Sequence, residues 1–304
     1  MRGKYILVAV LLALVLGSTL SCQPSSSSPA KSIVVTYSIL GSIVKELVGD
    51  GATVTVSVPN GLDPHEWQPS AKAIEAINKA DLVIENGLGL EASMEKTLQA
   101  ARDGGVKFFI ASDYITVRHV GSGEGIPSGD PDQVVGAPDP HLWMDPIAMK
   151  SVVSGLATVL MQELNLDVNS QAADLESRLD SLNTGIADTV AAIPQENRKL
   201  VTGHESMGYF AQRYDFKLVG VIVPSLSTQA GDSTANLAEL KKAIEDNQVK
   251  AIFTELGTNP DVANQIGAET GVEVVELTTH VLPSDGSYFT FMRDLATVIT
   301  DALK

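Results

Sequence analysis

The sequence predicts an α/β fold with two lobes, each holding a mainly parallel four-stranded sheet with covering helices, joined by one long rigid helix. Two observations lead to this prediction. Short runs rich in β-branched residues alternate with helical patterns along the chain, and these runs fall into two groups of four. A single long helical pattern lies between the two groups. The length of 304 residues suits one large domain or two ordinary ones.

The eight candidate strands are short apolar segments with polar or turn-forming residues around them. Helical patterns such as 71–80 and 237–247 lie between them, so we expect neighbouring strands to run parallel, with helices crossing over the sheets. The first group comprises 32–38, 53–58, 81–86 and 107–112, and the second comprises 199–204, 217–223, 250–255 and 273–278.

Apolar residues spaced three and four apart predict one buried face of the long helix between the groups. These residues are Leu175, Leu179, Leu182, Ile186, Val190 and Ile193, and Pro194 ends the pattern. A helix of about 23 residues is a stiff strut of roughly 35 Å. We therefore expect an N-terminal lobe at 32–168, a linking helix at 169–194 and a C-terminal lobe at 195–304, with little motion between the lobes.

The N-terminus has the features of a targeting segment. Arg2 and Lys4 precede an apolar run that is too short for a comfortable membrane span. Cys22, the single cysteine, follows this run and begins a Ser-rich linker at 22–31. The pattern resembles a bacterial lipoprotein signal, residues 1–21, cleaved before Cys22; an ordinary secretory signal is the alternative. We expect an extracytoplasmic protein anchored to the membrane by lipid on Cys22, which leaves no thiol for a disulfide or a metal.

The chain is acidic, with 21 Lys and Arg against 37 Asp and Glu and a net charge of −16. Removing residues 1–21 takes away two basic residues and no acidic ones, so the charge becomes −18. This balance argues against nucleic acid and anionic lipid surfaces as partners. A cation is a more natural ligand, although net charge does not locate its site.

One segment, 121–138, interrupts the alternation of strands and helices. It is rich in Gly and Pro and carries Glu124, Asp130 and Asp132. We expect a surface loop of uncommon length, with weak accessory capture of metal as the alternative role. His119 lies beside it and is expected to be a surface residue.

The other four of the five histidines occupy comparable places in the predicted fold. Two belong to a repeated frame, Asp-Pro-His-x-Trp, at 63–67 and 139–143, and two lie at the end of, or two residues after, candidate strands of the second group. In open α/β sheets, ligands bind beyond the carboxyl ends of the strands, so two histidines from each lobe can converge in a cleft. The four are His65, His141, His204 and His280.

A cluster of imidazoles suits Zn²⁺ and neighbouring transition metals, whereas Mg²⁺, Ca²⁺ and Mn²⁺ prefer oxygen. Four histidines would fill a tetrahedral shell and leave no metal-bound water to activate. Each ring should pass its second N–H to a carboxylate or a carbonyl. The candidate carboxylates are Asp63, Asp139, Asp145, Glu205 and Glu255. For Asp63 and Asp145 taken individually, capping of a turn or helix is the favoured role and support of a ring the alternative, and each single histidine could instead be a packing residue.

Five segments, taken together and in their order along the chain, resemble the metal-binding lipoproteins of ABC importers for zinc and manganese, the cluster A-I solute-binding proteins. The segments are DPHEWQPS (63–70), ADLVIENGLGLEASMEK (80–96), DPHLWMDP (139–146), VTGHESMGYFAQRY (201–214) and GVEVVELTTHVLPSDGSYFTFMRDL (271–295). The resemblance implies two α/β lobes with one metal ion in the cleft, held by His65, His141, His204 and one residue from the last segment. Histidine at the third of these positions is typical of zinc-type members, whereas manganese-type members tend to have Glu there.

The fourth ligand position departs from the family pattern, which usually has Asp or Glu where His280 stands. Three alternatives follow: His280 coordinates, Asp285 from the adjacent loop replaces it, or a water completes the shell. We favour His280 because it lies at a strand exit, whereas Asp285 precedes Gly in an apparent turn. A four-histidine shell has no anionic ligand, which further disfavours manganese.

The predicted function is therefore capture of a divalent transition metal outside the cytoplasm and its delivery to an ABC permease, by a monomer without enzymatic activity. Zn²⁺ is the expected cargo, with Mn²⁺, Ni²⁺ and Cu²⁺ as alternatives. A zinc-dependent hydrolase with an open coordination position and Glu205 as base is the competing hypothesis, but the chain has no H-E-x-x-H pair. Binding of an iron chelate or cobalamin is a third hypothesis, and the clustered histidines argue against it.

Overall fold

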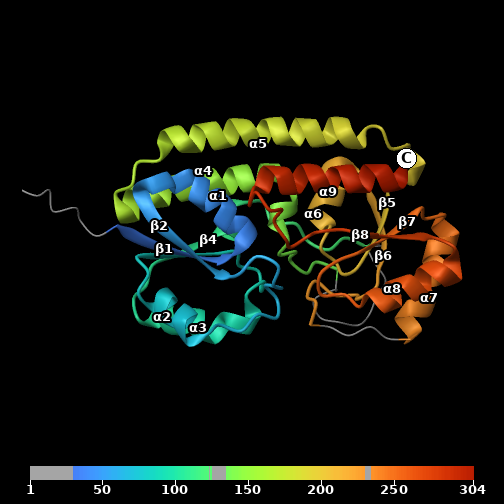
Figure 1. Cartoon of the computed structure of the whole chain (residues 1–304), viewed down its shortest axis with the longest axis horizontal. Coiled ribbons are helices and arrows are strands. Elements are labelled where there is room, and N and C mark those ends of the chain that lie inside the picture. The colour runs from blue at the N-terminus through green and yellow to red at the C-terminus, as the bar shows by residue number, and fades with distance from the viewer. Residues whose placement is uncertain (1–29, 123, 125–134, 230–233) are drawn as a thin grey trace, which may run out of the picture. The chain divides into compact units, whose positions relative to one another are not determined.

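Residues 30–304, except 123, 125–134 and 230–233, are described by a computed structural model (Figure 1). The predicted signal peptide, Cys22 and nearly all of the Ser-rich linker lie outside the described residues. Asp130 and Asp132 of the acidic segment 121–138 lie outside them as well. The predictions made for these parts of the chain remain predictions.

The first lobe is built on a four-stranded parallel sheet, as predicted. Its strands are β1 (Lys31–Tyr37), β2 (Ala52–Val58), β3 (Leu82–Glu85) and β4 (Phe108–Ile110), in the order β2-β1-β3-β4. The central strands β1 and β3 are almost wholly buried, which is typical of parallel strands with helices on both faces. All four carboxyl ends lie along one edge of this sheet.

The second lobe also has four strands at the predicted places, but they do not form one four-stranded sheet. They are β5 (Lys199–Thr202), β6 (Lys217–Val221), β7 (Ala251–Thr254) and β8 (Glu273–Glu276). They pair in parallel as β5-β6 and β7-β8. β5 lies beside β7, yet no ladder of hydrogen bonds joins these two described strands. β5 is also irregular on its other edge, where its register against β6 shifts between Leu200 and Val201.

Helices cover the strands of both lobes. In the first lobe, α1 (Ser38–Val48) covers one face of the sheet, and α2 (Ala71–Asn78) and α3 (Glu95–Asp103) lie on the other (Figure 1). The second lobe contains α6 (Gly208–Tyr214), α7 (Thr234–Asn247), α8 (Pro260–Thr270) and α9 (Tyr288–Leu303). Several of these helices begin at side-chain caps, such as Ser70 before α2 and Ser287 before α9.

Helix α4 (Pro146–Leu164) begins as the sequence predicts. The Asp145 carboxylate accepts a hydrogen bond from the backbone N–H of Ile147, at 2.8 Å, and Pro146 is the first helical residue. By length and composition alone α4 could cross a membrane. Here, however, much of it is buried against α1 and α5, as in the core helix of a globular protein.

Helix α5 (Asn169–Val190) is the predicted linking helix, and its predicted apolar face is buried. It packs against α1 and α4 of the first lobe and against α9 of the second (Figure 1). One continuous apolar core includes residues of α5 and of both lobes. Moving the lobes apart along α5 would expose such side chains, each of which contributes about 1.5–3 kcal/mol when fully buried. This packing gives a physical reason to expect a stiff connection.

Candidate metal centre

The four predicted histidines lie together between the two lobes. Each ring offers one nitrogen, and the four nitrogens all lie within 4.8 Å of one another. None of these residues is more than 3% exposed. A tetrahedral zinc shell with bonds of 2.0–2.1 Å would place its nitrogens about 3.3 Å apart, so the rings would close by up to about 1.5 Å around an ion. The four are His65, His141, His204 and His280.

The strand ends explain this convergence. His65 follows β2, His204 follows β5 and His280 follows β8, so all three come from carboxyl ends of parallel strands. His141 directly precedes the short 3₁₀ helix η5 (Leu142–Met144), which leads into α4. His119 is exposed and pairs with Pro138 in an isolated antiparallel bridge, as expected for a surface residue.

The two Asp-Pro-His segments form the same kind of local turn. Asp63 Oδ1 accepts a hydrogen bond from the backbone N–H of His65, and Asp139 Oδ1 accepts one from that of His141, each at 2.9 Å. An Asp side chain that bonds the backbone two residues later stabilises a tight turn. Each turn therefore fixes the backbone from which one imidazole projects.

The two tryptophans of the repeated frame have different roles. Trp143 is fully buried, and its ring centroid lies 5.2 Å from that of His141 and 5.3 Å from that of His280. Its indole N–H donates to the carbonyl of Thr279 at 2.9 Å, which ties the two lobes together beside the site. Trp67 is half-buried and packs against the continuous core, and its backbone N–H donates to the carbonyl of Asp63 at 3.1 Å. Trp143 thus shields the cluster, whereas Trp67 supports its own turn.

Asp139 orients the ring of His141. Its Oδ1 lies 2.9 Å from Nδ1 of His141, and its Oδ2 accepts from Nη1 of Arg118 at 2.9 Å. Burial raises the pKa of Asp139 to about 6, although Arg118 opposes the rise. The Arg118 guanidinium and the backbone N–H of His141 both donate to this carboxylate, which therefore acts as an acceptor toward the ring. Nδ1 of His141 then carries its proton, and Nε2 presents a lone pair to the other rings.

Glu255, directly after β7, orients the ring of His204. Its Oε1 accepts from the backbone N–H of His204 at 2.9 Å and lies 3.1 Å from Nδ1 of the same residue. The second contact is at ion-pair distance, although its geometry is not that of a regular hydrogen bond. Burial acts to raise the pKa of Glu255, but His204 outweighs this and lowers it to about 2. Burial acts to lower the pKa of His204, but Glu255 outweighs this and raises it.

The other three rings are held in the neutral form that a metal requires. Burial, together with neighbouring histidines, lowers the pKa values of His65, His141 and His280 well below 6.5. Nε2 of His141 and Nε2 of His204 lie 3.2 Å apart, so in the metal-free site one of these two nitrogens carries a proton and donates it to the other. Nε2 of His65 and Nε2 of His280 are buried without a hydrogen-bond partner among the described residues. Such unpaired buried groups are rare and suit ligands of an ion.

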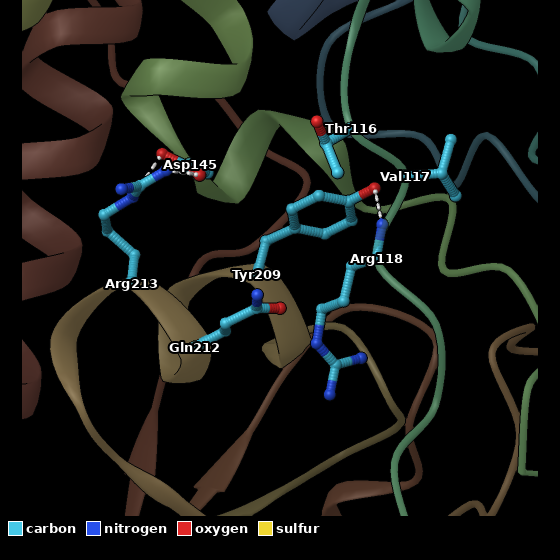
Figure 2. Close-up of a pocket in the computed structure, with 7 residues that line it drawn as sticks. All are labelled: Thr116, Val117, Arg118, Asp145, Tyr209, Gln212 and Arg213. Carbon is cyan, nitrogen blue, oxygen red and sulfur yellow. Dashed lines mark hydrogen bonds and ion pairs between the residues drawn. The ribbon is translucent and has the colours of Figure 1, made fainter.

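The structure corrects the prediction that Asp145 supports a histidine ring. Its carboxylate accepts from Nε and Nη2 of Arg213 at 2.9 and 2.6 Å, besides capping α4 (Figure 2). The hydrogen bond to Ile147 and the ion pair with Arg213 engage both oxygens. Asp145 therefore stabilises the start of α4 and does not orient a histidine ring. The pair lines a cavity of about 200 Å³ that also contains Tyr209, whose hydroxyl accepts from the backbone N–H of Arg118 (Figure 2).

The remaining candidate carboxylates occupy different surroundings. Asp63 receives a hydrogen bond of 2.7 Å from the Thr228 hydroxyl, which joins the turn of His65 to the second lobe. Glu205 is buried next to His204 and contributes, after Glu255 and Asp63, to raising the pKa of that histidine. Asp285 is exposed and accepts hydrogen bonds from the backbone N–H of Ser287 and the hydroxyl of Thr290 at the start of α9.

Three further residues shape the site without having been predicted from the sequence. Arg118 is buried and pairs with both Asp139 and Glu124. Gly208 begins α6, where a Cβ atom would lie 2.3 Å from Nη1 of Arg118 and from Oδ2 of Asp139, so a larger residue would push this ion pair out of its present position. Thr279 contacts both Glu255 and the ring of His280. Their sequence surroundings give no signal for these roles, beyond the position of Thr279 next to a histidine.

Comparison with known proteins agrees with this fold and places the chain in a family of metal-uptake components. The family model ZnuA, zinc-uptake complex component A, periplasmic, matches residues 33–302. The manganese-binding lipoprotein MntA of Halalkalibacterium halodurans is 26% identical over 259 residues, 84% of this chain and 81% of that protein. The high-affinity zinc uptake system protein ZnuA of Bacillus subtilis is 27% identical over 285 residues, 91% of this chain and 88% of that protein.

Solved structures share the two-lobe fold. The Mn-bound periplasmic metal binding protein from Candidatus Liberibacter asiaticus superposes with a TM-score of 0.77 at 22% identity, covering 90% of this chain and all of that one. The predicted fold class of two α/β lobes is therefore confirmed. At this identity the likeness concerns the fold alone.

Proposed function

Because this chain belongs to the ZnuA family of metal-binding components of ABC importers, which are not enzymes, we propose that its cargo is Zn²⁺, bound by the four buried histidines. The observation that carries the proposal is the convergence of four imidazole nitrogens from two lobes, with outer partners positioned to fix the rings. Captured zinc would then pass to an ABC permease for import.

The donor set favours zinc over manganese. All four proposed ligands are imidazoles, which Zn²⁺ prefers, whereas Mn²⁺ prefers oxygen. The names of the relatives do not choose between the metals, because MntA is named for manganese and the Bacillus subtilis protein for zinc. Ni²⁺ and Cu²⁺ share the preference for nitrogen but tend to square-planar coordination, whereas the proposal assigns Zn²⁺ its usual tetrahedral shell.

The same shell argues against the hydrolase hypothesis. Catalytic zinc keeps an open position for water, and four protein ligands in a tetrahedral shell leave none. Glu205 therefore needs no role as a base. In our proposal Asp285 caps α9, and His280 supplies the fourth ligand.

The expected location follows from the relatives and from the N-terminal sequence. MntA is named a lipoprotein, and the family model is described as periplasmic. We propose that the chain is extracytoplasmic, anchored by lipid on Cys22, and acts as a monomer. Free diffusion within reach of the membrane would then bring the loaded protein to its permease.

Competition among metals tests the proposed cargo. Protein purified without added metal should bind one Zn²⁺ per chain, and Zn²⁺ should be preferred over Mn²⁺ by roughly 100-fold or more, as the Irving–Williams order predicts for nitrogen donors. Elemental analysis after incubation with both ions at equal concentration measures the preference. Retention of Mn²⁺ in the presence of equimolar Zn²⁺ would contradict the proposal.

Zinc binding should release one proton from the site, and the pH dependence of the zinc affinity should show this. The lowered pKa values keep three rings neutral well below pH 6.5, whereas the raised pKa of His204 lets the free site hold a proton above that pH. Zinc must displace that proton, so affinity should fall about tenfold per pH unit as the pH drops below the pKa of His204. Titrations against a chelator between about pH 6.5 and 7.5, above the pKa of about 6 of Asp139, measure the slope with little contribution from that carboxyl. A slope that corresponds to the release of about four protons per zinc ion would contradict this prediction, because it would show that all four rings titrate as exposed imidazoles do.

A further inference from the structure

We propose that Thr279 is a positioning residue. Its hydroxyl links the carboxylate of Glu255 to the ring of His280 by hydrogen bonds, and this relay fixes the tautomer that presents Nε2 to the metal. The inference rests on the proposed function, because it requires His280 to be a ligand. It adds a residue outside the set of four histidines and assigns its hydroxyl a defined task.

The three groups form a buried chain. The Thr279 hydroxyl donates a hydrogen bond to Oε2 of Glu255, and its oxygen lies 2.8 Å from Nδ1 of His280. Thr279 is 0% exposed, His280 3% and Glu255 6%. Water is therefore a poor substitute for any contact in this chain.

The direction of the hydrogen bonds follows from the chemistry of the groups. An ionised carboxylate can only accept, so the single hydroxyl proton of Thr279 goes to Glu255. The hydroxyl oxygen is then left as an acceptor toward His280, whose Nδ1 must carry the ring proton. Nε2 of His280 consequently has a free lone pair, and it is the buried atom without a hydrogen-bond partner among the described residues.

One carboxylate thus orients two proposed ligands from the second lobe. Oε1 of Glu255 contacts His204 directly, and Oε2 reaches His280 through Thr279. Ser206 donates from its hydroxyl to the same carboxylate, at 2.8 Å to Oε2 and 3.1 Å to Oε1. Because Glu255 serves both rings, replacing it would disturb both, whereas removing the Thr279 hydroxyl should disturb His280 alone.

The backbone of Thr279 is held independently of its side chain. Its carbonyl accepts from the indole N–H of Trp143 at 2.9 Å. Thr279→Val keeps this bond and the shape of the side chain but removes the hydroxyl. Thr279→Ser keeps the hydroxyl. Thr278→Val makes the same change at the neighbouring exposed residue and is the matched control.

The experiment measures zinc affinity by chelator competition and the His280 tautomer by ¹⁵N NMR of the imidazole. We expect Thr279→Val to weaken zinc binding about 10- to 100-fold, as is typical for loss of an outer hydrogen-bond partner. Thr279→Ser should retain most of the wild-type affinity, and Thr278→Val should retain all of it. Wild-type His280 should show the Nδ1–H form with and without zinc, and the Thr279→Val variant a mixture of tautomers.

Separate outcomes contradict the relay and the proposed function. Wild-type zinc affinity and an unchanged tautomer in Thr279→Val would overturn the relay, as would equal losses in Thr279→Ser and Thr279→Val. An Nε2–H tautomer in the metal-free wild type would overturn it without any variant. Failure of the wild type to bind zinc, or wild-type affinity in His280→Ala, would instead overturn the proposed ligand set.

Discussion

Replacing His141 with alanine is expected to weaken zinc binding by at least about 100-fold, because a direct ligand should contribute more than the 10- to 100-fold typical of its outer partners. His141 is among the best pre-organised of the four rings. Asp139 holds its backbone N–H and its Nδ1, and its Nε2 lies 3.2 Å from Nε2 of His204. The measurement is a titration of the variant against a zinc chelator.

The same change should abolish most of the thermal stabilisation by zinc. At a free zinc concentration of about 1,000 times the wild-type Kd, binding stabilises the folded state by about 4.1 kcal/mol. A 100-fold weaker site at that concentration gains only about 1.4 kcal/mol. The zinc-induced change in Tm is therefore compared between the proteins, since removal of a buried ring also lowers the stability of the metal-free form.

His119→Ala is the matched control for this prediction. His119 is the one other histidine, and it is exposed. Its removal should leave the zinc affinity and the zinc-induced change in Tm at wild-type values. Unchanged zinc affinity in His141→Ala, or an equal loss in both variants, would contradict the proposed site.

The second large effect is expected at the fourth ligand. His280→Ala should lower zinc affinity by a factor similar to that of His141→Ala, because it also removes one of four nitrogens from a buried shell. Asp285→Ala should leave affinity unchanged, since its exposed carboxylate caps α9 through Ser287 and Thr290. Titration of both variants under one condition makes the comparison. The reverse result would show that Asp285, and not His280, supplies the ligand from this segment.

Much of the fold could be predicted because its signals are local. Each strand is a short β-branched run, and the spacing of apolar residues in α5 directly gives its buried face. The interruption of the second sheet could not be predicted, because it depends on pairing between β5 and β7, which are distant in sequence. No local sequence pattern indicates whether two strands so far apart in the chain will pair.

The candidate site was predictable only at its centre. His65, His141, His204 and His280 lie at strand exits or a helix start, and the geometry of parallel strands makes such places converge. Their partners were harder to predict because a carboxylate near a histidine can serve several roles. The sequence Asp145-Pro146 has the features of a helix cap, and capping together with Arg213 engages that carboxylate.

The outermost contacts depend on folding of segments far apart in the chain. Arg118 reaches Asp139 across 21 residues, and Thr279 reaches Glu255 across 24. An arginine or threonine in these surroundings has no distinctive sequence pattern. Folding within each lobe brings these groups to the rings, since Arg118 and Asp139 both belong to the first lobe and Thr279 and Glu255 to the second.

The central claim is that one zinc ion is held by four imidazole nitrogens, and X-ray absorption at the zinc edge tests it most directly. Protein loaded with one equivalent of Zn²⁺ should show four nitrogen neighbours at about 2.0–2.1 Å with the outer-ring scattering of imidazole. A shell with a carboxylate or water oxygen, or with fewer than four imidazoles, would contradict it.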